Sequence, residues 1–453
     1  MPNYKKLAKT YEKNILLALE RFISIPSVYD AKTAKEGQPY GANVRKALEY
    51  FGELGKQFGF NVDYCDGYCT ELSIGEEGPL IGIYGHSDVV PADGKWETKG
   101  PFQPTLKDGK IIGRGAIDDK GPLLAAFFAT KLLKDNGLIK GFRVKIVSGG
   151  DEERGSSCLR YYFEKHGGEA PKFGFTPDAD WPLIYAEKGI RHATAYLNED
   201  LSPVIAMNGG TVSNAVCASL LVTLPSDEGF VKYLKEKNIE CDISTHPGLL
   251  LVTFKGKTAH GSTPEKGKNA AIIAFSALGE YYKNEKLLKL AKILGDSTGA
   301  SFGGDNVSKE LGPSTFNYGV VNYGNGTLSV TIDYRFGEEA KPDEALARFK
   351  EATGMNVVES GASKLLIYDK KSPLVSLLMK AYKQETHKFF DKPLAIGGGT
   401  YAKEAPNTVA FGAEWKGHEG LMHSPNEFIY VEDLMKDVAI YARAIYLLGT
   451  SKK

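Results

Sequence analysis

Five short stretches of acidic and histidine residues are spread along the chain, and their side chains are of the types that bind divalent metal ions. The stretches are His86-Ser87-Asp88, Asp118-Asp119-Lys120, Asp151-Glu152-Glu153, Asp178-Ala179-Asp180 and the segment from His418 to His423. Imidazoles combined with several carboxylates suit zinc, or manganese with its stronger preference for oxygen. A metal lowers the pKa of a bound water to about 7, and a nearby carboxylate can then carry its proton. Together the stretches predict the site of a two-metal hydrolase.

Four of these stretches come just after an apolar, strand-like run, a few residues further along the chain. The runs are residues 80–84 before His86, 110–112 before Asp118, 142–147 before Glu152 and Glu153, and 172–175 before Asp178; His423 lies on a loop beyond residues 408–411. Ligands of an open α/β sheet collect at the carboxyl ends of its strands. We therefore expect these side chains to converge on one edge of a sheet.

Neighbouring carboxylates in two of the stretches are expected to take different roles. Asp118 and Asp119 cannot easily face the same metal, so one should bind and the other should support it. Glu152 and Glu153 likewise predict one ligand and one free carboxylate for proton transfer. Asp88, two residues after the histidine of the first stretch, is placed to accept from that imidazole and fix its tautomer. Each stretch alone could be turn or surface chemistry; the joint pattern favours a metal site.

The first third of the chain alternates helix and strand signals. Helices are predicted over residues 14–22 and 39–58, and another begins with Pro122 in its first turn and ends near Gly137. With the strands at 80–84 and 142–147, this βαβ order predicts a three-layer α/β domain with a mostly parallel sheet.

The pattern changes between about residues 191 and 370. Residues 249–254 and 327–336 are predicted strands, and 269–282 and 342–353 predicted helices. Strict polar and apolar alternation over 327–336 predicts an antiparallel strand with one face in water. A helix after Pro373 and a strand at 408–411 restore the earlier pattern. The prediction is a catalytic domain at 1–190 and 371–453, interrupted by an α+β lid domain at 191–370.

The length, charge balance and cysteine content of the chain narrow the class of protein further. The 453 residues exceed the usual size of a single core. Equal numbers of basic and acidic residues, 56 of each, give no reason to expect nucleic acid or an anionic membrane as partner. A signal peptide and a membrane span are not expected. Five scattered cysteines (Cys65, Cys69, Cys158, Cys217 and Cys241) indicate reduced thiols of a cytoplasmic protein. Cys65 and Cys69 could be half of a zinc site, but no second Cys or His pair has matching spacing.

Four motifs resemble the signature set of the di-zinc exopeptidase and deacylase family, which includes carnosinases, aminoacylases and succinyl-diaminopimelate desuccinylases. They are His86-Ser87-Asp88-Val89-Val90-Pro91, Gly113-Arg114-Gly115-Ala116-Ile117-Asp118-Asp119-Lys120-Gly121, Asp151-Glu152-Glu153 and His423-Ser424-Pro425-Asn426-Glu427. They occur in family order, and the resemblance spans nearly the whole chain. The tracts at 175–180 and 397–402 are similar to the bacterial dipeptidase V group within this family.

The resemblance implies a set of five metal ligands. Asp118 would bridge two ions, His86 and Asp178 would complete the shell of one, and Glu153 and His423 would complete the shell of the other. Asp180 is the alternative to Asp178, whose Thr-Pro-Asp context is closer to the motif.

Catalytic roles are implied in the same way. Glu152 would be the general base and later the acid, Asp88 would support the first histidine, and Asp119 would be structural. His260, in Thr-Ala-His-Gly-Ser, matches a lid histidine that contacts the scissile carbonyl oxygen. Without the family context it would be an ordinary loop histidine.

Four further residues are implied to bind the substrate. Arg335 matches a lid arginine that binds the C-terminal carboxylate, and its alternative is an exposed strand arginine paired with Asp333. Asn214 matches a substrate-binding asparagine, although the Ala-Val-Cys that follows departs from the family pattern. Gly398 and Gly399 could bring backbone groups to the substrate, or could belong to a flexible turn.

These observations predict a cytoplasmic, metal-dependent dipeptidase that cleaves short peptides with a free C-terminal carboxylate. Its cofactors would be two divalent ions, zinc or alternatively manganese. An insertion of about 180 residues resembles an enlarged lid that supplies its histidine in cis, which predicts a monomer. The first alternative is an N-acyl-amino-acid deacylase with the same site. The second, a peptide-binding protein without catalysis, is disfavoured because no ligand or base is missing.

Overall fold

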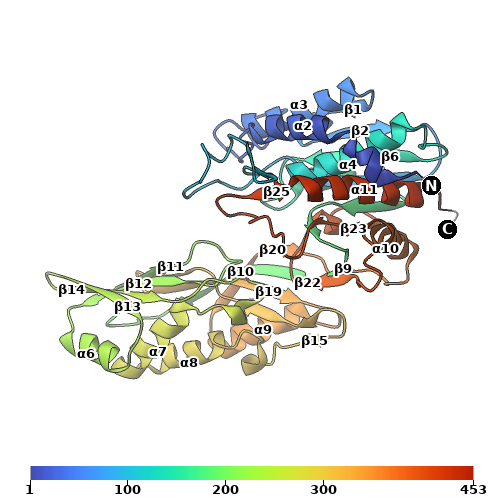
Figure 1. The fold of residues 1–453 in the computed structure, drawn as a ribbon. Helices are drawn as coiled ribbons and strands as arrows, with labels where there is room; N and C mark the ends of the chain where they lie inside the picture. Colours follow the sequence, from blue (N-terminus) through green and yellow to red (C-terminus); the bar gives the residue numbers. More distant parts are fainter. Residues whose placement is uncertain (1, 452–453) are drawn as a thin grey trace. The chain divides into compact units, whose positions relative to one another are not determined.

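The computed structural model describes residues 2–451 and divides into two compact units (Figure 1). Unit 1 comprises Met1–Tyr185, Ile367–Leu394 and Thr400–Lys453, and unit 2 comprises Ala186–Leu366 and Ala395–Gly399. Chain segments far apart in sequence thus fold together in unit 1. Among the described residues, no helix is both long enough and apolar enough to span a membrane.

The sheet of unit 1 has a parallel centre and antiparallel edges. Seven of its nine strands are, in spatial order, β1 (Asn61–Asp63), β2 (Cys69–Ile74), β6 (Arg143–Gly149), β3 (Leu80–His86), β7 (Phe173–Thr176), β23 (Thr408–Ala410) and β9 (Ile184–Glu187). The neighbours among β6, β3, β7 and β23 pair in parallel, whereas β1 with β2, β2 with β6, and β23 with β9 are antiparallel. All of β3 is buried, so both faces of this strand are covered, as is typical of parallel sheets. The predicted α/β class is confirmed.

The described part of unit 1 also contains seven α-helices. They are α1 (Tyr4–Lys9), α2 (Glu12–Ile23), α3 (Ala42–Gln57), α4 (Lys120–Asp135), α5 (Ser157–Glu164), α10 (Pro373–Thr386) and α11 (Val431–Gly449). Helix α4 is almost entirely buried and packs against β3, α2 and α11. Its near-continuous apolar surface explains this central position, and its first turn directly follows Asp118 and Asp119.

The run at residues 110–112 does not join the main sheet as expected. It forms β5 (Lys110–Ile112), which pairs with β4 (Thr105–Lys107) and β25 (Phe428–Tyr430) in a small antiparallel sheet. Asp118 therefore does not lie at the carboxyl end of a main-sheet strand. Only three residues long, β5 carries too little pattern for its sheet to be assigned from sequence. A second small pairing joins β8 (Ala179–Asp180) and β24 (Ala413–Glu414).

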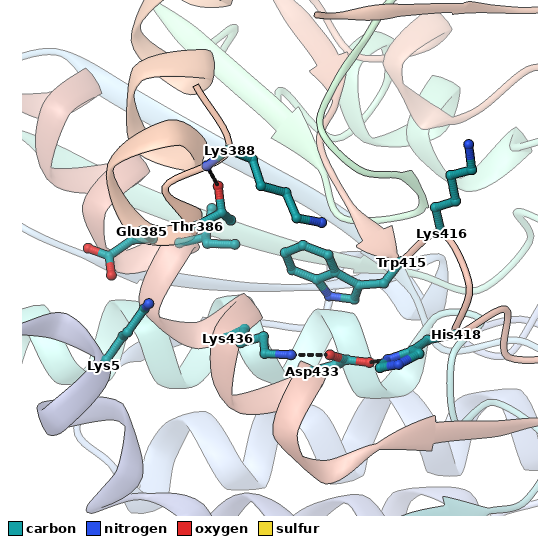
Figure 2. Close-up of a pocket in the computed structure, with 10 residues that line it drawn as sticks. Lys5, Glu385, Thr386, Lys388, Trp415, Lys416, His418, Asp433 and Lys436 are labelled. Carbon is teal, nitrogen blue, oxygen red and sulfur yellow. Dashed lines mark hydrogen bonds and ion pairs between the residues drawn. The ribbon is translucent and has the colours of Figure 1, made fainter. Parts of the chain in front are cut away.

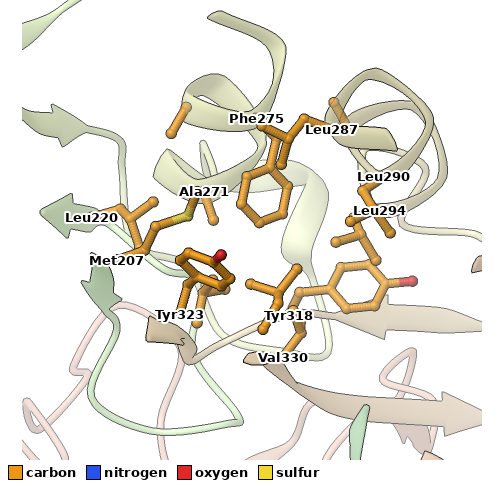
Figure 3. Packing of buried hydrophobic residues seen from close by; sticks show 14 of the residues in the cluster. Met207, Leu220, Ala271, Phe275, Leu287, Leu290, Leu294, Tyr318, Tyr323 and Val330 are labelled. Atoms are coloured by element: carbon orange, nitrogen blue, oxygen red, sulfur yellow. The ribbon is translucent and has the colours of Figure 1, made fainter. Parts of the chain in front are cut away.

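Unit 2 contains an antiparallel sheet with helices packed on its apolar face. The strand order is β13 (Cys241–His246), β14 (Leu249–Lys255), β12 (Ser219–Pro225), β11 (Ala206–Gly209), β18 (Val321–Gly324), β19 (Thr327–Phe336), β10 (Gly189–Asn198) and β20 (Asn356–Ser363), and β17 (Thr315–Asn317) also pairs with β19. The helices are α6 (Glu228–Glu236), α7 (Ala270–Tyr282), α8 (Glu285–Leu294) and α9 (Pro342–Thr353). In the core, Met207 and Val330 of the sheet approach Phe275 of α7 and Leu290 of α8 (Figure 3).

Strand β19 departs from its predicted half-exposed pattern. Asp333 is 0% exposed and Arg335 only 3% exposed, although both belong to the polar face. The loop that contains Gly261 covers this face: a Cβ at Gly261 would lie 2.7 Å from Asp333 Oδ2. Alternation showed which residues share a face, but not that another loop covers that face.

Candidate active site

Asp118 lies between two imidazole rings in unit 1. Its Oδ1 atom is 2.9 Å from His86 Nε2, and its Oδ2 atom is 2.8 Å from His423 Nε2. His86 ends β3, whereas Asp118 immediately precedes the Asp119 that caps α4. The three residues come from distant parts of the sequence, and one carboxylate reaches both rings.

Two further carboxylates complete the sides of this arrangement. Asp178 Oδ2 is 3.6 Å from His86 Nε2, and Glu153 Oε2 is 3.2 Å from His423 Nε2. Potential ligand atoms of His86, Asp118 and Glu153 lie within 4.8 Å of one another, and so do those of His86, Glu152 and Asp178. The structure thus brings all five predicted ligands and Glu152 together.

Asp180, the alternative to Asp178, lies apart from these ligand groups. It belongs to β8, its side chain is exposed, and it pairs in register with Glu414 of β24. Asp178 directly precedes β8 and is the residue that reaches His86. Positions i and i+2 of a strand share a face, so side-chain alternation does not distinguish the two aspartates; the contact with His86 does.

Asp88 contacts both the first histidine and the glutamate pair. Its backbone carbonyl accepts from His86 Nδ1 at 2.9 Å, while its Oδ1 atom is 3.5 Å from that nitrogen. The carboxylate accepts the backbone N–H groups of Glu152 at 3.1 Å and Glu153 at 3.2 Å. Asp88 therefore orients the imidazole mainly through its backbone and the glutamate pair through its side chain.

Replacing Asp88 by asparagine is expected to weaken binding of divalent ions by about 10- to 100-fold, the usual effect of losing an outer-shell partner. An amide NH2 would face one of the two backbone N–H groups and displace the glutamates. The measurement is competition for zinc with a chelating dye. Asp93→Asn, at an exposed position, is the control. Equal affinity in both variants would contradict this role.

Glu427 and Arg114 organise the loop before Asp118, and sequence reasoning did not assign them a role. Glu427 Oε1 accepts from the backbone N–H groups of Gly115, Ile117 and Asp118 at 2.9, 3.1 and 3.2 Å. Its other oxygen accepts from Arg114 Nη1 at 2.5 Å. Burial raises the pKa of Glu427 to about 7, although the guanidinium opposes this shift. Glu427 closes the His423-to-Glu427 motif, which was the available signal.

Asp119 supports the first histidine from behind. Its Oδ2 atom accepts the backbone N–H of His86 at 3.0 Å, and its side chain is fully buried. Burial, together with the charge of Asp178, raises the pKa of Asp119 well above its ordinary value. Asp119 thus contacts the backbone of His86 and not its imidazole ring.

The cluster contains more carboxylates than nearby cations can balance. Burial raises the pKa of Glu153 to about 7, and burial with the charge of Asp178 raises the pKa of Glu152 well above its ordinary value. Hydrogen bonds to Asp118 and Glu153 raise the pKa of His423 to about 11. The excess of negative charge therefore favours the protonated forms of the imidazole and carboxyl groups. A bound cation would offset the repulsion between these carboxylates.

The predicted residues of unit 2 form one patch within that unit. The backbone N–H of Gly261 donates to Asn214 O at 2.7 Å, and Ala215 forms a β-bridge with His260. His260 Nδ1 is 2.7 Å from Ser262 Oγ. Asn317 Nδ2 donates to the carbonyls of residues 213 and 215 and holds this segment, a contact with no sequence signal.

Arg335 belongs to the same patch and is oriented by two neighbours. Its Nε and Nη2 atoms donate to the two oxygens of Asp333, both at 2.9 Å, and Nη1 donates to Gly397 O at 2.7 Å. A Cβ at Gly397 would lie 2.6 Å from Ser262 Cβ, so the glycine permits close approach. Gly398 and Gly399 follow directly in the chain. The pairing with Asp333 is present, but Arg335 is buried rather than exposed.

His418, from the fifth stretch, lies in a different pocket of unit 1. This cavity of about 260 Å³ is lined by Trp415, His418, Asp433 and several lysines (Figure 2). His418 Nδ1 is 2.5 Å from Asp433 Oδ2, and Lys436 Nζ donates to Asp433 at 2.8 Å. His418 groups with Glu432 and Asp433 and not with the ligand atoms around Asp118.

The fold and the site define the class of this protein, and its similarity to known proteins defines its family. The fold and the carboxylate–imidazole cluster are those of a two-unit α/β hydrolytic enzyme. The profile of peptidase family M20/M25/M40 matches residues 82–447. The chain belongs to this family, and it is an enzyme that hydrolyses peptides.

Relatives of similar length support this assignment. "Putative dipeptidase YtjP" of Bacillus subtilis is 33% identical, with 97% of this chain and 98% of the relative covered. A "Putative dipeptidase" of Staphylococcus epidermidis is 32% identical, and the match covers 98% of this chain and 99% of the relative. The dipeptidase Dug1p of Saccharomyces cerevisiae has a similar fold, with a TM-score of 0.61, 14% identity and 99% and 98% coverage. Human carnosine dipeptidase 1 also has a similar fold, with a TM-score of 0.59 and 13% sequence identity; the match covers 99% of this chain and 98% of that one.

Proposed function

We propose that this chain is a metal-dependent dipeptidase that cleaves short peptides with a free C-terminal carboxylate. The observation that carries the proposal is the position of Asp118, whose two oxygens each lie within hydrogen-bond distance of a different imidazole. The dipeptidase names of its relatives support the substrate class. In this proposal unit 1 is catalytic, and unit 2 carries substrate-binding residues.

The residues of the cluster fit two divalent ions. Imidazole nitrogens and carboxylate oxygens are the donors that zinc and manganese take. Glu153 Oε1 is buried and has no hydrogen-bond partner among residues 2–451, so it is an acceptor that a cation would satisfy. His86 and Asp178 would hold one ion, Glu153 and His423 would hold the other, and Asp118 would contribute to both.

Glu152 would move the proton in this reaction. The chemistry that a pair of divalent ions supplies is polarisation of the peptide carbonyl and acidification of water. Glu152 accepts a proton from the attacking water at its carboxylate and then donates it to the nitrogen of the leaving amine. The hydrogen bond from its backbone N–H to Asp88 Oδ1 supports a fixed backbone position for Glu152.

Residues of unit 2 would recognise the substrate. In the proposal, Ser262 donates its hydroxyl proton to His260 Nδ1, which keeps the imidazole proton on Nε2 for the oxyanion of the transition state. Arg335 has five N–H groups, and Asp333 and Gly397 take three of them, which leaves two for a carboxylate. Asp333 thus supports a fixed orientation of the guanidinium toward the substrate.

A substrate panel tests this function. The protein is stripped with a chelator, reloaded with zinc or manganese, and assayed for initial rates. We expect an Ala-Ala dipeptide to be hydrolysed about 10- to 100-fold faster than Ala-Ala amide, because the amide lacks a charged hydrogen-bond partner worth about 1.5–3 kcal/mol. Acetyl- and succinyl-amino acids are the comparison substrates. Faster cleavage of these N-acyl compounds than of the dipeptide would instead support a deacylase.

A further inference from the structure

We propose that Asp63, Cys65 and His166 form an additional binding site for a divalent metal ion of the zinc type, separate from the carboxylate–imidazole cluster. Their potential ligand atoms lie within 4.8 Å of one another. All three belong to unit 1 and none of them belongs to the predicted catalytic set. The proposal does not depend on the dipeptidase function.

The site joins two segments that are about one hundred residues apart in sequence. Asp63 ends β1, and Cys65 opens the short 3-10 turn Cys65–Gly67 before β2. His166 follows α5 and places its Nε2 atom 2.9 Å from Asp63 Oδ2. A bound ion would therefore link the β1–β2 connection to the end of α5.

The carboxylate of Asp63 is oriented before any ion binds. Its Oδ1 atom accepts the backbone N–H of Cys65 at 2.9 Å, which directs Oδ2 toward the imidazole of His166. The Cys65 residue is only 1% exposed, and its Sγ atom lies 3.8 Å from the carbonyl oxygen of Asp63. The thiol thus approaches from the protein interior, and the carboxylate from the solvent side.

A second carboxylate occupies the opposite side of the imidazole. Asp66 Oδ2 is 3.2 Å from His166 Nδ1 and accepts from Tyr161 Oη at 2.8 Å. Metal-bound histidines usually donate their other ring N–H to an acceptor of this kind, which fixes the tautomer. With its proton on Nδ1, the ring presents the lone pair of Nε2 toward Asp63 and Cys65.

The donor types select the kind of ion. One thiolate sulfur, one imidazole nitrogen and one carboxylate oxygen are ligands of zinc, whereas magnesium and calcium prefer oxygen alone. Binding requires the thiol proton of Cys65 and any proton on His166 Nε2 to leave for solvent. An ordinary ion pair between His166 and the aspartates would not involve the sulfur, so participation of Cys65 separates the two interpretations.

Cobalt provides a probe that reports on the sulfur directly. The predicted catalytic ligands contain no cysteine, so a thiolate-to-cobalt charge-transfer band in the near ultraviolet can come only from another site. Full-length reduced protein is stripped of metal and titrated with Co²⁺. We expect the wild-type protein to develop this band and to bind one cobalt equivalent more than Cys65→Ser, which should lack the band.

Three further variants complete the test. His166→Gln should lose most of the band, and Asp66→Asn should keep it but require about 10- to 100-fold more cobalt, as for other outer-shell partners. Cys241→Ser, on β13 of unit 2, is the matched control and should behave as wild type. Circular dichroism checks that each variant is folded. The proposal is overturned by absence of the band in wild type at saturating cobalt, or by a band that survives Cys65→Ser.

Discussion

Replacing Glu152 by glutamine is expected to lower kcat by about 10²- to 10⁴-fold, the range in which general acid–base groups contribute. The glutamine amide has nearly the same shape but cannot accept the proton of the attacking water. The same variant should keep both metal equivalents, measured by elemental analysis of the purified protein. The expected result is therefore a loss of activity on a dipeptide with no loss of metal content.

Metal content makes the Glu152 test specific. Glu152 shares a possible ligand group with His86 and Asp178, so a variant that loses an ion would show that this residue is a ligand. Glu164→Gln, the same change at an exposed position of α5, is the control and should retain full activity. A loss of only about tenfold in activity would contradict the assignment of Glu152 as base, because general acid–base groups usually contribute more than this.

Replacing Asp118 by asparagine is expected to remove at least one of two bound ions and to lower kcat/KM by about 10³-fold or more. Asp118 is the carboxylate with one oxygen near each imidazole, and its neutral amide would leave both proposed ion positions short of charge. Loss of an ion that polarises the carbonyl costs several kcal/mol of transition-state stabilisation, and about 4 kcal/mol corresponds to 10³-fold.

Asp180→Asn is the matched control for Asp118→Asn. Asp180 is an exposed aspartate of β8, outside the ligand groups, so metal content and kcat/KM should remain at wild-type values. Loss of an ion in Asp180→Asn would favour Asp180 over Asp178 as ligand. Retention of two ions in Asp118→Asn would remove the basis for a shared carboxylate.

Much of the fold was predictable because long elements carry strong periodic patterns. The alternating run at 327–336 became β19 with those bounds, and 342–353 became α9. The buried helix after Pro122 became α4. The short run at 110–112 was placed in the wrong sheet, since three residues do not specify a pairing partner.

The candidate site was predictable to the extent that its residues occur in recognisable motifs. Those motifs named the carboxylates and imidazoles that the structure brings together around Asp118. They did not show that Asp88 holds the glutamate pair through its carboxylate, or that Glu427 holds the loop before Asp118. Such roles depend on which backbone N–H groups face a given oxygen, and that direction is set by folding.

The sequence by itself determined the chemical types of the site, the α/β class and the membership of a peptidase family, because motif order and periodicity are local properties of the chain. Only the tertiary structure brought Asp178 rather than Asp180 to His86 and buried the polar face of β19. It also placed His166 beside Cys65, where cysteine spacing had offered no partner. Each of these depends on distances between segments far apart in sequence, which packing of the whole core decides.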